Sequence, residues 1–161
     1  MRFRLYISLI IALLATSCGE YEKILKSTDF DLKKTKALEY FNEGRYLRAT
    51  ELLTQVLPRY RATGEAEELT WISAQCYYNV NDYMTAGAAY KNFYEGYPYN
   101  EHAEEAAFMA AYCDYLMAPR PELDQAYTMA AIEGFEYFKR RYPASEKIEE
   151  ADNIIRDCQD K

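Results

Sequence analysis

The chain repeats itself at a fixed spacing, and this repeat constrains its fold more than any other feature of the sequence. The stretch AEELTWISAQC at residues 66–76 returns as AEEAAFMAAYC at residues 103–113, an offset of 37 residues. Each unit contains two helix-like patterns and no strand-like alternation, which is typical of stacked helical hairpins. Four further residue pairs keep the same offset: Tyr40 and Tyr77, Tyr46 and Tyr83, Ala49 and Ala86, Tyr60 and Tyr97.

Two later units follow at a longer spacing. Tyr97-Pro98 returns as Tyr142-Pro143 at an offset of 45, and IEEADNIIRDC at residues 148–158 overlays residues 103–113 at that same offset. The additional residues fall around positions 118–125, where two prolines break a helix. The sequence therefore predicts three helix-turn-helix units and the first helix of a fourth.

The turn inside each unit carries residues that end one helix and let the next pack closely. Gly44 suits the left-handed backbone that closes a helix, Asn81 takes its place one unit later, and Ala49 lets two helix axes approach. The stretch Glu43-Gly44-Arg45-Tyr46-x-x-Ala49 resembles the tetratricopeptide turn, in which Tyr46 would plug the gap between the helices. We therefore expect an all-α fold, a tetratricopeptide-type α-solenoid of about three and a half helix-turn-helix repeats, over residues 29–161.

Three of the four cysteines occupy one equivalent position in successive units. Cys76, Cys113 and Cys158 each end the repeated stretch and follow an apolar stripe on the same helix. Equivalent residues of stacked repeats lie about 10 Å apart, whereas a disulfide needs Cα atoms within about 7 Å. The pattern predicts three buried, unpaired thiols, although an exported protein would also permit an oxidised pair.

The N-terminus has the features of an export signal. Residues 1–17 combine two arginines, an apolar run and a small-residue end, and Ser17-Cys18 resembles the lipobox of bacterial lipoproteins. The run is too short to cross a bilayer. We expect a lipoprotein signal peptide over 1–17, lipidation of Cys18 and a tether over 18–28; a soluble exported protein is the alternative.

The first helices of the units place aromatic residues on one common face. On a helix wheel Trp71, Gln75 and Tyr78 fall together with Glu68, away from the stripe that ends in Cys76. We expect this face to line the concave side of the solenoid as an aromatic trough that binds a peptide or partner protein, with core packing as the alternative. The trough consists of Lys34, Leu38, Phe41, Trp71, Gln75, Tyr78, Phe108, Tyr112 and Tyr115.

Charge and composition argue against several functional classes. The formal charge is −7, and removing residues 1–17 takes away two arginines and no acid, which leaves −9. Such a surface disfavours nucleic acid. His102 is the single histidine, so no metal site is expected, and no serine or threonine has a neighbouring base. The pairs Glu67-Glu68, Glu104-Glu105 and Glu149-Glu150 recur at one repeat position, where acids favour a helix N-terminus. No catalytic residue and no cofactor other than a lipid on Cys18 is predicted.

The whole mature chain resembles a known lipoprotein family. The lipobox, CGEYEKILKSTD after it, and PELDQAYTMAAIEGFEYFKRRYPAS at residues 121–145 together resemble the BamD family of the outer-membrane β-barrel assembly machinery, most closely its Bacteroidetes-type versions. The resemblance implies a protein anchored to the outer membrane on the periplasmic face, with the barrel-forming assembly subunit and unfolded barrel precursors as partners. Family members usually continue to about five repeats, which leaves open a C-terminal truncation.

Two other functions remain open from the sequence. Another tetratricopeptide lipoprotein could coordinate cell-wall synthesis or division, with peptidoglycan synthases as partners. An enzyme or accessory subunit acting on envelope glycans would need a carboxylate pair that faces one cleft.

Overall fold

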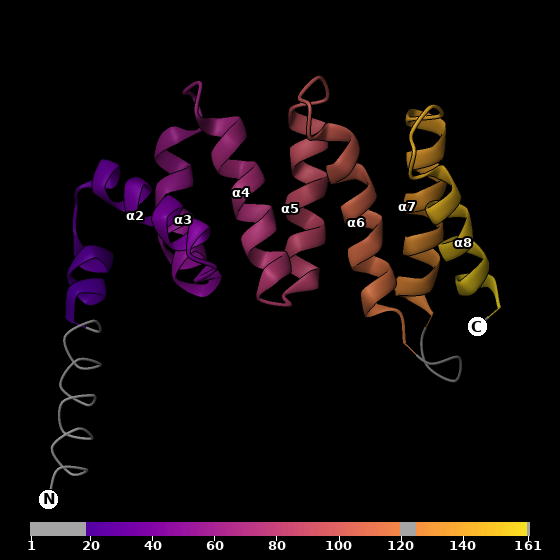
Figure 1. The fold of residues 1–161 in the computed structure, drawn as a ribbon, viewed down its shortest axis with the longest axis horizontal. Helices are drawn as coiled ribbons and strands as arrows, with labels where there is room; N and C mark the ends of the chain where they lie inside the picture. Colours follow the sequence, from indigo (N-terminus) through magenta and orange to yellow (C-terminus); the bar gives the residue numbers. More distant parts are fainter. Residues whose placement is uncertain (1–18, 120–124, 161) are drawn as a thin grey trace, which may run out of the picture.

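The computed structural model describes residues 19–119 and 125–160, and the regular secondary structure in this part of the chain is all helix. The helices stand side by side in chain order, so that α2 and α8 lie at opposite ends of the array (Figure 1). A further helical segment covers residues 19–26. The helices are α2 (Phe30–Asn42), α3 (Tyr46–Tyr60), α4 (Ala66–Asn79), α5 (Tyr83–Gly96), α6 (Ala103–Met117), α7 (Ala126–Arg141) and α8 (Ile148–Gln159).

The predicted α-solenoid of about three and a half repeats is confirmed. α2 pairs with α3, α4 with α5, and α6 with α7, while α8 is the first helix of a fourth unit. Each helix packs chiefly on the helices before and after it in the chain, as expected for stacked hairpins. Within residues 19–119 and 125–160, no helix has the length and apolar character needed to cross a membrane.

The two predicted turn residues both adopt left-handed backbone. Gly44 has φ 72° and Asn81 has φ 62°. After Gly44, the backbone N–H of Arg45 donates to the carbonyl of Tyr40 at 2.8 Å, and after Asn81 the N–H of Asp82 donates to the carbonyl of Tyr77 at 3.0 Å. Both are the hydrogen bonds of a Schellman helix end. The sequence therefore encodes the same reversal twice with two different residues.

Small residues bring the helices of each pair together, as the turn pattern predicts. Ala49, Ala86 and Ala131 are fully buried at equivalent positions. The second helices α5 and α7 end at Gly96 and Arg141, and the next residue, Tyr97 or Tyr142, comes directly before a proline, which disfavours helical geometry there. The three thiols are also as predicted: Cys76, Cys113 and Cys158 are buried, and none of them is in a disulfide.

The expected tether over residues 18–28 is wrong in extent. Within the helical segment 19–26, Tyr21 and Ile24 are buried in the core formed by α2, α3 and α4. The Tyr21 ring packs edge-on against Tyr40 at 5.7 Å, and its hydroxyl donates a hydrogen bond to Glu51 of α3. The packed domain therefore begins near residue 19, while the signal peptide over 1–17 and the lipidation site Cys18 lie outside the described residues.

Burial of the thiols gives a testable reactivity. It raises the pKa of Cys76 and Cys113 to about 12. An unfolded thiol titrates near pH 8.5. Because the folded pKa is higher, the two protonated thiols stabilise the fold fully below pH 8.5, and this stabilisation is lost as the pH rises toward 12. In the Cys18→Ser variant at pH 8, we expect three thiols to react with a maleimide in urea and none of them rapidly in the native protein. Fewer than three thiols in urea without reductant would instead indicate a disulfide.

Candidate functional site

The structure divides the predicted aromatic trough into buried and accessible residues. Trp71 and Phe108, two of the predicted trough rings, are 7% and 3% exposed and belong to the core. Trp71 packs against Tyr90 and Phe93 of α5, at 5.5 and 5.4 Å between ring centroids. Phe108 meets Phe135 and Phe138 of α7 at 5.2 and 5.4 Å. The prediction of an open trough is therefore wrong at these two positions.

The loop that begins the next repeat covers both rings. His102, the residue just before α6, stacks on Trp71 with 4.5 Å between centroids and 4° between the planes. Lys147, the residue just before α8, places its ammonium 4.6 Å from the centre of the Phe108 ring. Each ring is thus enclosed by its own repeat and by the following one.

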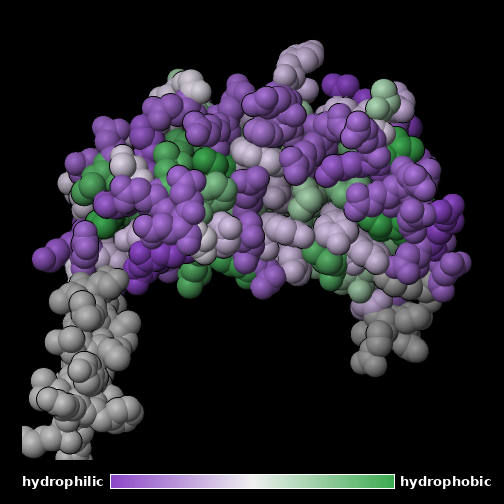
Figure 2. Space-filling model, in the orientation of Figure 1, coloured by the Kyte–Doolittle hydropathy of each residue, from purple (hydrophilic) through white to green (hydrophobic). Residues whose placement is uncertain are grey.

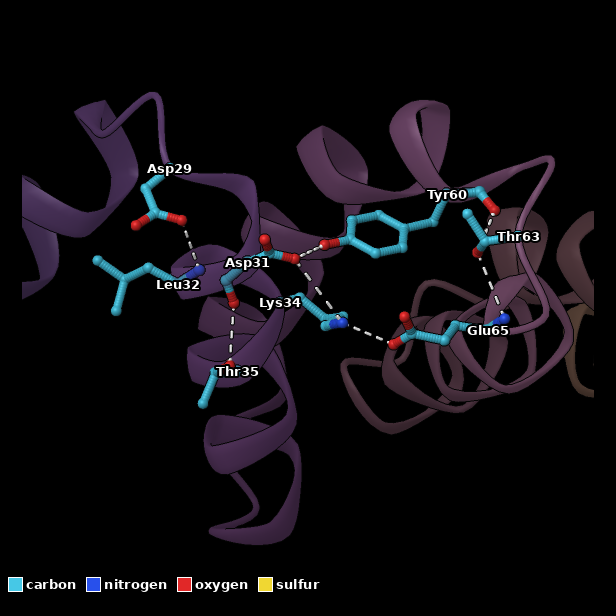
Figure 3. Close-up of polar contacts among 8 residues, drawn as sticks. All are labelled: Asp29, Asp31, Leu32, Lys34, Thr35, Tyr60, Thr63 and Glu65. Carbon is cyan, nitrogen blue, oxygen red and sulfur yellow. Dashed lines mark hydrogen bonds and ion pairs between the residues drawn. The ribbon is translucent and has the colours of Figure 1, made fainter.

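Lys34, the equivalent residue on α2, makes the same contact with different chemistry. Its ammonium lies 2.6 Å from the carboxylate of Glu65, the residue just before α4, and 3.9 Å from Asp31 (Figure 3). The hydrogen bond from Lys34 to Glu65 is the main reason its pKa is raised. The Tyr60 hydroxyl completes the group by donating to Asp31. Lys34, expected to contact a partner, is therefore held within the molecule.

These three pairs form one repeated interaction, which we name the N-cap contact. It joins Lys34 to Glu65, Trp71 to His102 and Phe108 to Lys147. The geometry recurs while the chemistry changes from an ion pair to a ring stack to a cation over a ring. The sequence contains a signal for this contact. The first partners follow one another at an offset of 37 residues, and the second partners follow at offsets of 37 and then 45.

The glutamate pairs are also used within the repeat. Asn100 donates to Glu67 at 2.7 Å, and Ser145 donates to Glu104 at 2.5 Å, so a loop residue of one unit binds the first-turn acid of the unit before. Glu104 is half-buried, whereas the other five acids of the pairs are exposed. In the part of the chain that the structure describes, no group of three or more His, Cys, Asp or Glu side chains is placed to hold a metal ion.

Four predicted residues remain half-exposed and form what we name the tyrosine ledge: Gln75 and Tyr78 on α4 with Tyr112 and Tyr115 on α6. Tyr112 lies 5.8 Å from Tyr115 and stacks over Phe108 at 6.1 Å between centroids. Tyr78 lies 5.6 Å from Tyr83 between ring centroids, and burial is the main reason that its pKa is raised. The ledge thus takes its residues from the first helices of two successive repeats.

The other two trough residues lie at the N-terminal end. Leu38 and Phe41 are half-buried against the core of the first repeat, and Phe41 packs edge-on against Tyr46 at 5.9 Å. Hydrophilic residues cover most of the face shown in Figure 2, and hydrophobic ones appear there as separate small patches. The apolar trough residues that are not buried therefore fall into two groups, the tyrosine ledge and the N-terminal pair Leu38 and Phe41.

Comparison with known proteins connects the chain to one family. Residues 33–161 match the family model YfiO, described as an outer membrane lipoprotein. A comparison with curated proteins gives no match. The matched region begins in α2 and includes every later helix, so it covers the N-cap contacts and the tyrosine ledge.

Proposed function

Because the chain belongs to the YfiO family of outer membrane lipoproteins, we propose that it is a lipid-anchored scaffold of the machinery that assembles β-barrel proteins. The family match over residues 33–161 is the observation that carries this proposal. Cys18 carries the lipid, the solenoid faces the periplasm, and the protein acts by binding rather than by a covalent step. Its partners are the barrel-forming assembly subunit and unfolded barrel precursors.

The tyrosine ledge is the surface that we assign to precursor binding. Tyrosine rings offer large contact area with little loss of side-chain entropy, and their hydroxyls pair with backbone groups of an extended chain. Tyr78 and Tyr112 are half-exposed, and Tyr112 stacks on the buried Phe108 ring. A precursor segment that ends in an aromatic residue would stack on these rings.

Affinity capture tests the proposed role. The full chain with its own leader and a C-terminal tag is expressed in its host, and detergent-solubilised envelopes are passed over the affinity resin. We expect recovery of the barrel-forming assembly subunit. Recovery of peptidoglycan synthases without that subunit would favour the alternative role in cell-wall synthesis, and recovery of neither would overturn the proposal.

A peptide with the last ten residues of an outer-membrane barrel strand tests the ledge. We expect Tyr112→Ala to weaken its binding by about fivefold or more, as measured by fluorescence anisotropy, because the central ring is removed. Tyr112→Phe keeps the ring and should bind nearly as the unchanged protein does. Tyr99 is 96% exposed and lies outside the ledge, so Tyr99→Ala is the control. Equal binding by Tyr112→Ala and Tyr99→Ala would contradict the assignment.

A further inference from the structure

A groove runs along the second helices, on residues that the tyrosine ledge does not include. α5 and α7 form its walls and α6 its floor, and its volume is about 520 Å³. On α6 the floor positions are Ala107, Ala110, Asp114 and Met117, which follow one another at three or four residues. This spacing is one helix face over about three turns, or about 15 Å.

The floor is low because its residues are small. Gly87 of α5 and Gly134 of α7 face α6, and a Cβ atom at Gly134 would lie only 2.7 Å from the Ala111 Cβ. Large apolar side chains stand at the rim instead. Met84 is 63% exposed, Tyr137 37% and Tyr127 36%. A low floor with apolar walls suits a ridge of side chains on an inserted helix.

The groove is acidic. Asp114 lies half-buried at its floor, with Glu95 and Glu133 on the two walls and Lys91 as its one cation among the lining residues. Three carboxylates against one ammonium leave two net negative charges. Among residues 19–119 and 125–160, no side chain forms a hydrogen bond or an ion pair with Asp114, and burial raises its pKa against a smaller opposing effect of Lys91. Partial burial of the charged Asp114 carboxylate therefore costs free energy, and a cation bound beside it would reduce that cost.

The equivalent groove one repeat earlier has a different character. It lies between α3 and α5 over α4, and Tyr77 stands there in the place of Asp114. Its lining residues include Arg61 and no carboxylate. The buried acid is thus a property of the groove between α5 and α7 and does not follow from the repeat architecture.

We propose that the groove between α5 and α7 binds an amphipathic helix of a partner protein through an Arg or Lys that pairs with Asp114. Apolar residues three or four positions away from that cation rest on Met84 and Tyr137. The charge of the groove selects a basic helix, and its three-turn length matches helix-in-groove recognition. This site is independent of the role assigned to the tyrosine ledge.

The test selects binders from a displayed library of amphipathic helices on the full Cys18→Ser chain. We expect the selected peptides to carry one basic residue with apolar neighbours at three or four residues. Their affinity should fall at least about tenfold on Asp114→Asn and on Met84→Ala. Glu150→Gln, an exposed acid on α8, and Met129→Ala, a 62% exposed residue on α7 outside the groove, are the matched controls.

The folding readout separates loss of the site from loss of the fold. Asp114→Asn removes a half-buried charge, so its melting temperature should equal or exceed that of the unchanged protein. Selected helices without an enriched basic residue, an empty selection, or binding that survives Asp114→Asn would each overturn the proposal. A concentration-dependent dimer that Asp114→Lys abolishes would also overturn it, because a second copy of the chain would then occupy the groove.

Discussion

Replacing Trp71 with alanine is expected to lower the free energy of unfolding by about 3–5 kcal/mol. The side chain is 7% exposed and contacts Tyr90, Phe93 and His102, so its removal leaves a cavity between two repeats. The loss should be measured by urea unfolding at neutral pH. A residue whose main role was to contact a partner from an open surface would change stability by no more than about 0.5 kcal/mol.

Two further variants identify the cause of that loss. Trp71→Phe retains a ring against Tyr90 and Phe93 and should recover much of the stability. Tyr99→Ala removes a ring that is 96% exposed and should leave stability nearly unchanged. If Trp71→Ala and Tyr99→Ala had the same small effect, Trp71 would not be part of the core.

The second large effect is expected at Gly134, near the middle of α7. In an open helix, glycine to alanine stabilises by about 1 kcal/mol. At Gly134 the new Cβ would lie 2.7 Å from the Cβ and 3.2 Å from the Cα of Ala111, so the α6 backbone itself must move. Overpacking of this kind costs about 1–3 kcal/mol, and we expect Gly134→Ala to be destabilising overall.

Gly96 provides the matched control, because it is also helical and a Cβ there meets nothing within 4 Å. Gly96→Ala should therefore be neutral or slightly stabilising in the same thermal and urea unfolding measurements. Opposite signs for the two substitutions would confirm the close approach of α6 and α7. A stabilising Gly134→Ala would show that the two helices lie further apart.

The architecture could be predicted from sequence because its determinants are local and repeated. Gly44 and Asn81 mark left-handed helix ends, and Ala49 with its equivalents marks the close crossing of paired helices. Such residues act through backbone geometry within a few positions, so their spacing is sufficient. Burial of the three cysteines could be predicted for the same reason, because equivalent positions of a solenoid have similar surroundings.

The accessible surface could not be predicted as well, because burial depends on residues far along the chain. A helix wheel correctly separates Trp71 from the stripe that ends in Cys76, but it describes one helix alone. The ring that covers Trp71 comes from His102 in the following loop. The same holds for Phe108, because Lys147 and α7 enclose its ring.

The start of the packed domain could not be predicted from the repeat for a related reason. Residues 19–26 form less than one repeat and have no equivalent later in the chain, so periodicity gave no sign of them. Tyr21 and Ile24 are three positions apart and both are buried against the first repeat. A short amphipathic helix of this kind covers the exposed end of a solenoid, which otherwise lacks a neighbouring repeat.

The N-cap contact shows how a repeat protein can keep its geometry while its sequence varies. An ion pair, a ring stack and a cation over a ring each join a first helix to the start of the next unit. Because stability in such arrays is nearly a sum of neighbouring interactions, each pair can change independently. Residues outside these contacts, in the tyrosine ledge and the acidic groove, are then available for binding.

Trp71 is the chain's single tryptophan, so its fluorescence tests directly whether this ring of the predicted trough belongs to the core. Iodide, a quencher that stays in water, should leave the emission of the native protein nearly unchanged and quench it strongly in urea. The emission should also shift to longer wavelength on unfolding. Equal quenching of the native and the unfolded protein would contradict the enclosed N-cap contact and restore Trp71 to an open binding surface.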